Sequence, residues 1–188
     1  MKFTQHTPTT APTASFPLIE KSKAAYGFLP NLHAVMAESP ALYEAYLTVF
    51  DLVSQTSLTP IEQQVVMMTA NYENNCHYCV PGHTYLMGAI GAPKDVIEAL
   101  REGTPIADAR LETLRRFTRE MIENRGHVSE AAIESMDEAG YTRQQMLEVI
   151  VGLAAKTLSN YTNALAKTEV DAPVRPFAWV HPSQRVAV

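Results

Sequence analysis

The chain lacks the patterns that mark several classes of protein. No run approaches the roughly 20 apolar residues of a membrane-spanning helix, so we expect no membrane association. Its 15 Lys and Arg residues form no basic cluster and the formal net charge is −5, which argues against nucleic acid as a partner. The first residues contain no apolar run typical of a secretory signal, so a cytoplasmic location is expected. The alternation of apolar and polar residues that indicates strands is also missing, and the predicted fold class is all-α.

Proline marks the two ends of the chain. Residues 1–17 contain three prolines and no helical periodicity, which predicts a flexible N-terminal segment. Residues 18–170 contain repeated helix signals and are expected to form one helical domain. Residues 171–188 again contain three prolines, together with the only tryptophan. We expect them to form an extended C-terminal arm that lies on the domain or on a neighbouring subunit.

Two capping boxes give the clearest helix starts. Thr59 is followed three positions later by Glu62, and Thr142 in the same way by Gln145. The second box is expected to open a helix that runs to about Lys167. Residues 59 and 142 lie 83 positions apart, and this offset predicts a degenerate internal repeat whose second copy has lost its cysteines.

The only two cysteines stand close together as Cys76 and Cys79, and His83 follows. In a helix, steps of three and seven residues place side chains on one face, so these three are expected to lie together. Asn75 is expected to cap a helix that begins at Cys76, where free N–H groups and the helix dipole stabilise a thiolate. A nearby imidazole favours the thiolate, and a second cysteine can close a short disulfide with the first. The spacing therefore predicts dithiol redox chemistry.

These residues also carry a family resemblance. The stretch from Leu58 to Val66, followed by Cys76-His77-Tyr78-Cys79 and His83, resembles the core of the AhpD-like alkylhydroperoxidases in the carboxymuconolactone decarboxylase family. The resemblance implies an AhpD-like helical bundle that assembles as a homo-oligomer, a trimer or a hexamer. It implies a peroxidase that reduces organic hydroperoxides without cofactor or metal and is recycled by an external thiol or dithiol reductant. Cys79 would attack the peroxide, Cys76 would resolve the product as a disulfide, and His83 would belong to a proton relay, with His77 where the family tolerates a second relay residue.

The sequence departs from this family at one residue of the relay. The family places a glutamate twelve residues before the first cysteine, and here that position is Gln64, which cannot take up a proton. Glu62 is expected to be occupied in the capping box. Glu73 lies three residues before Cys76, so we expect it to be the substitute base. Without it the relay would depend on His83 and a water molecule.

Other interpretations of the cysteines stay open. Cys76, Cys79 and His83 supply three ligands for a structural zinc ion, and the fourth would come from Glu73, His77, water or another subunit. A thioredoxin-like site needs a strand before the motif, which the pattern lacks, and the thiols could instead be inert core residues. On the same scaffold, a carboxymuconolactone-decarboxylase-type enzyme would need no cysteine pair. A non-enzymatic protein in which the disulfide switches an interaction is the remaining alternative.

Overall fold

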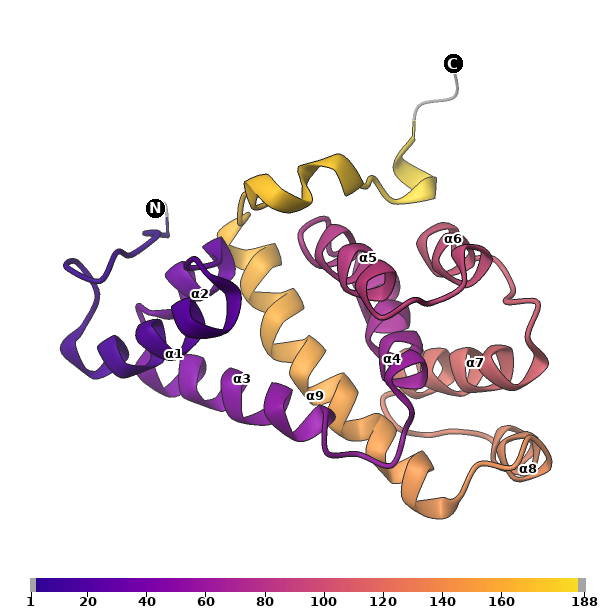
Figure 1. Cartoon of the computed structure of the whole chain (residues 1–188). Helices are drawn as coiled ribbons and strands as arrows, with labels where there is room; N and C mark the ends of the chain where they lie inside the picture. The colour runs from indigo at the N-terminus through magenta and orange to yellow at the C-terminus, as the bar shows by residue number, and fades with distance from the viewer. Residues whose placement is uncertain (1–2, 186–188) are drawn as a thin grey trace.

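The computed structural model describes residues 3–185, and every regular element in that range is helical, which confirms the all-α prediction (Figure 1). None of these helices combines the length and apolar character needed to cross a bilayer. The helices are α1 (Phe16–Tyr26), α2 (Asn31–Met36), α3 (Pro40–Val53), α4 (Pro60–Glu73), α5 (Cys79–Ala89), α6 (Lys94–Glu102), α7 (Ala109–Glu123), α8 (Glu130–Glu138) and α9 (Arg143–Ala166), with short 3-10 turns η1 (Thr13–Ser15), η2 (Ala172–Phe177) and η3 (Pro182–Gln184).

Helix α9 lies between two groups of helices (Figure 1). It packs against α2 and α3 on one side and against α4 on the other, and α4 is in turn covered by α5, α6 and α7. The larger apolar core, which includes Val65, Leu114 and Met136, belongs to the α4–α8 group. A second apolar cluster joins residues of α1, α2 and α3 to Cys76 and Cys79. The N-terminal helices therefore form part of the surroundings of the two thiols.

Both predicted capping boxes are formed. The Thr59 hydroxyl accepts from the Glu62 backbone N–H and the Glu62 carboxylate accepts from the Thr59 N–H, so α4 begins at Pro60. The same reciprocal bonds between Thr142 and Gln145 start α9. The two helices differ beyond their starts, because α9 continues unbroken to Ala166 whereas α4 ends at Glu73. The predicted repeat therefore matches in its first helix and does not extend through the cysteine motif.

A glycine allows α9 to approach α4. A Cβ atom added at Gly152 would lie 2.7 Å from Val66 Cγ1, and Val66 is itself buried. We expect Gly152→Ala to destabilise the protein, because overpacking costs about 1–3 kcal/mol and outweighs the gain of about 1 kcal/mol in helix propensity. Gly88 in α5 has no heavy atom near its added Cβ. Gly88→Ala should therefore stabilise the protein, and chemical denaturation of both variants measures the difference in sign.

The two terminal segments lie on the helical domain. The His6 N–H donates to the Ala34 carbonyl at 3.0 Å and the Ser15 hydroxyl donates to the Ala37 carbonyl at 2.7 Å. Helix α1 begins at Phe16, before the expected domain boundary, and takes Pro17 into its first turn, where a missing N–H costs nothing. The structure thus corrects the expectation of a flexible segment for residues 3–17, while residues 1–2 lie outside the described range.

The C-terminal arm lies on its own domain, the first of the two arrangements expected for it (Figure 1). The Trp179 indole donates to the Arg101 carbonyl at 2.8 Å, and the Arg101 guanidinium donates back to the Phe177 carbonyl at 3.1 Å. The arm also forms the turns η2 and η3 and is therefore less extended than predicted. Residues 186–188 of the expected arm lie outside the described range.

Candidate active site

The cysteine motif follows a break between α4 and α5. Asn75 adopts a left-handed conformation with φ of 49°, and the Cys76 N–H donates to the Asn71 carbonyl at 2.9 Å, which closes the end of α4. Residues 76–78 form a turn, and α5 begins at Cys79. The expected helix starting at Cys76 is therefore wrong, because Asn75 terminates α4 instead of capping the next helix. It is Cys79 that occupies the helix start, where the dipole favours a thiolate.

Three hydrogen-bond donors point at the sulfur of Cys79, and a fourth points at the sulfur of Cys76. Both cysteines are free and buried, with exposed fractions of 3% for Cys76 and 4% for Cys79. The side-chain amides of Asn160 and Asn163, both on α9, donate to Cys79 Sγ at 3.1 and 3.3 Å. The Cys76 thiol also donates to the Cys79 sulfur, and Cys76 Sγ accepts from the Cys79 backbone N–H at 3.3 Å. Donors of this kind stabilise a negative charge on sulfur.

The two thiols consequently differ in acidity. Burial by itself would raise the pKa of Cys79, but the hydrogen bond from Cys76, the positive charge of Lys156 and the two asparagine amides lower it to about 6. The hydrogen bond that the Cys76 thiol donates to Cys79 raises the pKa of Cys76, and its burial raises it further. The hydrogen bonds and the charge of Lys156 therefore favour a thiolate on Cys79 and a protonated thiol on Cys76.

A buried chain of three side chains continues from α4 through α5 to α9. His83 Nδ1 lies 2.8 Å from Gln64 Oε1, and His83 Nε2 lies 2.9 Å from Lys156 Nζ. Because an ammonium group can only donate, Nε2 accepts from Lys156, and Nδ1 carries the ring proton and donates to the Gln64 carbonyl oxygen. Burial lowers the pKa of His83 well below its ordinary value, and the charge of Lys156 lowers it further. His83 is therefore a neutral link between Gln64 and Lys156.

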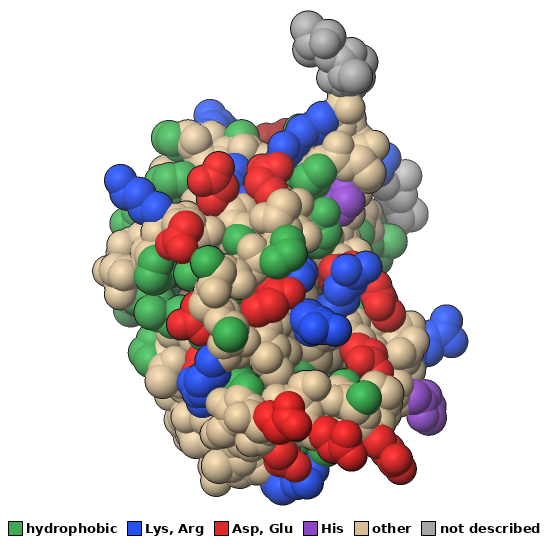
Figure 2. All heavy atoms as spheres, turned by 90° about the vertical axis from the view of Figure 1, so that its right-hand side faces the viewer, with side chains coloured by type: hydrophobic (Ala, Val, Ile, Leu, Met, Phe, Trp, Pro, Cys, Tyr) green, Lys and Arg blue, Asp and Glu red, His purple; other side chains and the backbone are tan. Residues whose placement is uncertain are grey.

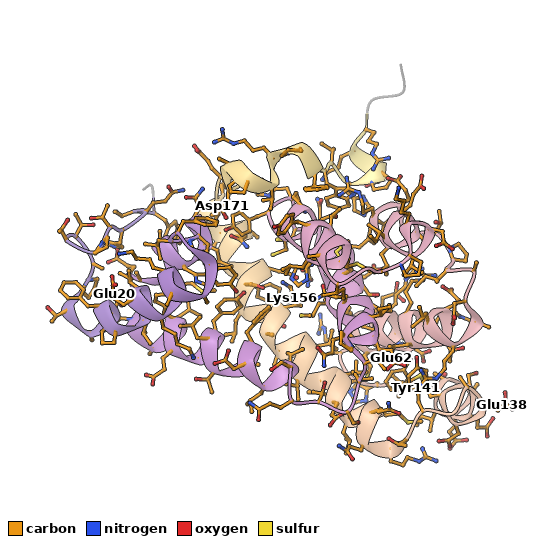
Figure 3. All side chains as sticks on the ribbon, in the orientation of Figure 1. Glu20, Glu62, Glu138, Tyr141, Lys156 and Asp171 are labelled. Carbon is orange, nitrogen blue, oxygen red and sulfur yellow. The ribbon has the colours of Figure 1, made fainter. Side chains whose placement is uncertain are left out.

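Lys156 lies near the centre of the molecule, between α9 and α5 (Figure 3). Its exposed fraction is 1%. Lys156, Asn160 and Asn163 are four and three residues apart, so one face of α9 carries all three toward the motif. Sequence reasoning missed these residues, although polar side chains at this spacing within an apolar helix were a signal that could have found them.

A set of asparagines holds the amide of Asn160 in position. The Asn160 amide also donates to Asn71 Oδ1 at 2.9 Å, and its oxygen accepts from the Asn74 amide at 3.0 Å. The neighbouring Asn163 differs, because within residues 3–185 its buried side-chain oxygen has no hydrogen-bond partner. A buried acceptor without a partner is unusual in folded proteins, and here it lies beside the two thiols.

Two of the predicted site residues lie elsewhere. Glu73 stands nine residues after Gln64 on α4, which places it on the opposite side of the helix, and its carboxylate lies 3.5 Å from Arg119 Nε on α7. Burial raises the pKa of Glu73. The structure thus corrects the expectation that Glu73 replaces the relay glutamate. His77 Nε2 donates to the Thr168 carbonyl at 3.0 Å, so it ties the motif to the end of α9 and takes no part in the chain through His83.

The geometry of His83 bears on the zinc alternative. Both ring nitrogens are already hydrogen-bonded, one to Gln64 and the other to Lys156. The ammonium of Lys156 occupies the position that a metal ion bound to His83 Nε2 would need. Within the described range no group of three or more His, Cys, Asp or Glu side chains is arranged to hold a metal ion.

Comparisons with known proteins agree with this fold. Residues 40–120 match the model of the carboxymuconolactone decarboxylase family. A search of curated proteins finds no significant match.

Several solved structures share the architecture over nearly their whole length. The peroxidase-related protein from Silicibacter sp. TM1040 has a TM-score of 0.77 at 16% identity, covering 93% of this chain and 92% of its own. The peroxidase-related protein from Ralstonia eutropha JMP134, with an alkylhydroperoxidase AhpD core, has a TM-score of 0.79 at 20% identity, covering 92% and 93%. The debrominase Bmp8, in complex with 2,3,4-tribromopyrrole, has a TM-score of 0.73 at 16% identity, covering 94% and 95%.

Proposed function

We propose that the chain is a thiol-dependent peroxidase for organic hydroperoxides, because residues 40–120 match the model of the carboxymuconolactone decarboxylase family and the chain has the AhpD-like fold. The observation that carries the proposal is the set of hydrogen-bond donors around the Cys79 sulfur, with a second thiol three residues away. A thiolate on Cys79 is the nucleophile that attack on a peroxide requires, and a protonated thiol on Cys76 lies next to it. A structural cysteine pair would need neither the thiolate nor the donors around it.

The first step is attack of the Cys79 thiolate on the terminal oxygen of the hydroperoxide. The O–O bond breaks, the sulfur gains an S–O bond and becomes a sulfenic acid, and the alkoxide leaves as an alcohol after taking up one proton. The free side-chain oxygen of Asn163 accepts the O–H of the incoming hydroperoxide, and its amide nitrogen holds the attacking sulfur. One side chain thus orients both reactants.

The proton for the leaving alkoxide comes from the Lys156–His83 pair. The family pattern puts a carboxylic acid at position 64. Gln64 accepts a hydrogen bond from His83 Nδ1–H but cannot exchange a proton with the ring. The ammonium of Lys156 donates to His83 and carries a proton that it can give up. Lys156 therefore supplies from α9 both the positive charge that stabilises the thiolate and the proton that a relay glutamate would have supplied from α4.

The second step joins the two cysteines. The Cys76 sulfur attacks the Cys79 sulfenic acid, an S–S bond forms, and hydroxide leaves as water with the Cys76 proton. An external thiol or dithiol then reduces the disulfide by exchange and restores both thiols. The alcohol, the water and the oxidised reductant account for all atoms and for the two electrons that each turnover transfers.

Titration of free thiols in the reduced protein tests the proposal. One equivalent of a small organic hydroperoxide, such as tert-butyl hydroperoxide, should remove both thiols of the wild-type protein, and a dithiol reductant should restore them. The buried thiols should react more slowly with a bulky hydroperoxide than with a small one. Two thiols that survive the peroxide would refute a peroxidase, and thiols that become titratable only after a chelator is added would indicate a metal site.

The debrominase among the similar structures gives a second candidate. The same pair could reduce a brominated aromatic ring, whereby two thiols become a disulfide, carbon–bromine becomes carbon–hydrogen, and bromide and a proton are released. Bromide release from a bromopyrrole, measured beside alcohol release from a hydroperoxide, separates the two reactions. Alcohol formation without bromide supports the peroxidase.

A further inference from the structure

Tyr46 on α3 is a buried tyrosine whose hydroxyl has no hydrogen-bond partner among residues 3–185. Its exposed fraction is 5%. The other buried tyrosines all have a partner for the hydroxyl: Tyr43 with Ser22, Tyr78 with Asp171, and Tyr141 with the Arg110 carbonyl. Because the hydroxyl of a buried tyrosine normally forms a hydrogen bond, an unpaired one points to a bound ligand.

The position of Tyr46 along α3 brings it close to the asparagines of α9. Helices α3 and α9 lie side by side and run in opposite directions (Figure 1). Val53 at the end of α3 and Ala155 on α9 belong to one small apolar cluster. Seven residues make about two helical turns, so Tyr46 lies on the same face of α3 as Val53 and close to the level of Asn163.

The two thiols belong to the same part of the core. One apolar cluster contains Tyr46, Cys76 and Cys79. Asn163 donates to the Cys79 sulfur from α9, and its own side-chain oxygen has no partner within the part of the chain that the structure describes. A ligand that accepts from the Tyr46 hydroxyl and donates to the Asn163 oxygen would satisfy both groups beside the thiols.

The surroundings of Tyr46 limit the charge of such a ligand. Every Asp, Glu and Lys side chain of α1, α2 and α3 is exposed, so the buried side of these helices is uncharged. Charged side chains of both signs gather on other surfaces, such as the face that carries α6, α7 and α8 (Figure 2). The ligand is therefore a neutral molecule with an apolar part, an oxygen that accepts and an O–H that donates. An uncharged organic hydroperoxide, R–O–O–H, has all of these.

We infer that the Tyr46 hydroxyl binds the substrate of the proposed peroxidase reaction and stabilises its leaving group. It donates to the inner oxygen of the hydroperoxide, which carries the organic group, while Asn163 Oδ1 accepts from the terminal O–H. This inference rests on the proposed function, and its substrate class is an uncharged alkyl hydroperoxide.

The hydrogen bond from Tyr46 strengthens during the reaction. The Cys79 sulfur forms its bond to the terminal oxygen, the O–O bond breaks, and the electron pair of that bond moves to the inner oxygen as an alkoxide. A hydrogen bond to an anion is stronger than one to a neutral oxygen, so Tyr46 favours the transition state over the bound substrate. The proton that converts the alkoxide into an alcohol still comes from Lys156 and His83, and Tyr46 keeps its own.

The environment of Tyr46 suits a group that donates without losing its proton. Burial raises the pKa of Tyr46 well above its ordinary value, and the nearby ionisable groups of Tyr26, Cys79 and Cys76 raise it further. The hydroxyl is therefore protonated over the pH range in which Cys79 reacts as a thiolate.

Neighbouring rings hold Tyr46 in one orientation. Its ring centroid lies 5.5 Å from that of His33 on α2 and 5.7 Å from that of Phe50 on α3. His33 is itself fixed, because its Nδ1 is hydrogen-bonded to the Ser22 hydroxyl at 2.9 Å. A donor on a ring held in this way needs little reorganisation when the alkoxide forms.

Two oxidants with different leaving groups test the role of Tyr46. tert-Butyl hydroperoxide releases tert-butoxide, a strong base that depends on a hydrogen-bond donor, whereas peracetic acid releases acetate, a weak base that does not. Tyr46→Phe should lower the rate constant for tert-butyl hydroperoxide by about tenfold to a hundredfold, the loss expected for one hydrogen bond to an anion. The rate constant for peracetic acid should change by less than about threefold. Equal losses with both oxidants, or no loss with tert-butyl hydroperoxide, overturn the inference.

A control variant and the wild-type protein separate this inference from the proposed function. Tyr161 on α9 is 63% exposed, so Tyr161→Phe should leave both rate constants unaltered. Alkylation of Cys79 by iodoacetamide should have the same pH profile in Tyr46→Phe as in the wild type, because Cys79 keeps its hydrogen bonds. A wild type that consumes neither oxidant refutes the peroxidase itself. A wild type that consumes both, with equal losses in Tyr46→Phe, refutes only the role of Tyr46.

Stability gives a readout that does not depend on activity. Tyr46→Phe removes an unpaired hydroxyl and should leave the denaturation midpoint unchanged or higher, whereas Tyr43→Phe removes a hydroxyl that is bonded to Ser22 and should lower it. If Tyr46→Phe lowers the midpoint as much as Tyr43→Phe does, the Tyr46 hydroxyl has a structural partner in the protein and the inference is wrong.

Discussion

Replacement of Cys79 by serine should reduce peroxide consumption to the rate of the protein-free solution, whereas replacement of Cys76 by serine should leave a single turnover. The Cys79 thiolate is the attacking group, and a serine hydroxyl at its place keeps its proton at neutral pH. In Cys76→Ser the new hydroxyl can still donate to Cys79, so the nucleophile remains active. Without a second thiol the sulfenic acid cannot become a disulfide.

The two variants give opposite readouts in one assay. One equivalent of hydroperoxide should leave the thiol of Cys79→Ser unchanged and convert the single thiol of Cys76→Ser into a product that reacts with a sulfenic-acid trap. The reverse result, an inert Cys76→Ser and a reactive Cys79→Ser, would assign the nucleophile to Cys76. That assignment would contradict the acidities that the hydrogen bonds around the pair predict.

Lys156→Met should slow peroxide consumption at pH 7 by about tenfold or more. Removal of a neighbouring positive charge raises the pKa of a thiol by about 1–3 units. The thiolate fraction at neutral pH then falls steeply, and the greater nucleophilicity of the more basic thiolate compensates only in part. Methionine is similar in size to the lysine stem, so the substitution preserves packing at position 156, although His83 Nε2 loses its hydrogen-bond donor.

The rate of peroxide consumption should increase with pH, because the thiolate of Cys79 is the reactive form. In the wild-type protein the Cys79 thiol ionises near pH 6, below its ordinary pKa of 9.0, so the rate should rise as the pH passes through about 6 and stay level above. In Lys156→Met this rise should shift to higher pH, and the two proteins should approach each other in alkaline solution. The lowered pKa also means that ionisation of Cys79 stabilises the fold above pH 9 and that this contribution is lost as the pH falls through about 6.

Alkylation of the thiol by iodoacetamide measures the pKa of Cys79 without peroxide and separates loss of ionisation from loss of proton donation. Lys94→Met is the matched control, because Lys94 is an exposed lysine at the start of α6, and it should leave both profiles unchanged. An alkylation profile of Lys156→Met that coincides with that of the wild type would mean that Lys156 does not stabilise the thiolate.

Local sequence signals predicted the helical elements well. The boxes at Thr59 and Thr142 are reciprocal bonds between residues three positions apart, so nothing distant decides whether they form. The break at Asn75 was harder to predict, because asparagine both caps helices and adopts the left-handed conformation that ends them. In the structure the Cys76 N–H bond to the Asn71 carbonyl closes α4 at Asn75, and residue types alone do not reveal that bond.

The candidate site shows the same division between local and distant information. Cys76, Cys79 and His83 could be selected from their spacing, and the resemblance drew attention to Gln64. Lys156 lies 73 residues after His83, and the two meet because α9 packs closely on α4 at Gly152, one turn before the lysine. Proximity in the sequence instead favoured Glu73, which helix geometry turns away from the thiols.

The buried charge of Lys156 also bears on the reduction potential of the cysteine pair. In the dithiol form the ammonium faces a thiolate. In the disulfide form that negative charge is gone, and Lys156, once it has regained from solvent the proton given to the alcohol, is a buried cation beside the neutral ring of His83. A buried charge without a counter-charge is unfavourable, so the oxidised state is the less stable of the two. Thiol oxidoreductases whose reduced form is stabilised in this way have oxidising disulfides. The disulfide of this protein should therefore accept electrons from weakly reducing thiols, and recycling should not require a strongly reducing dithiol partner.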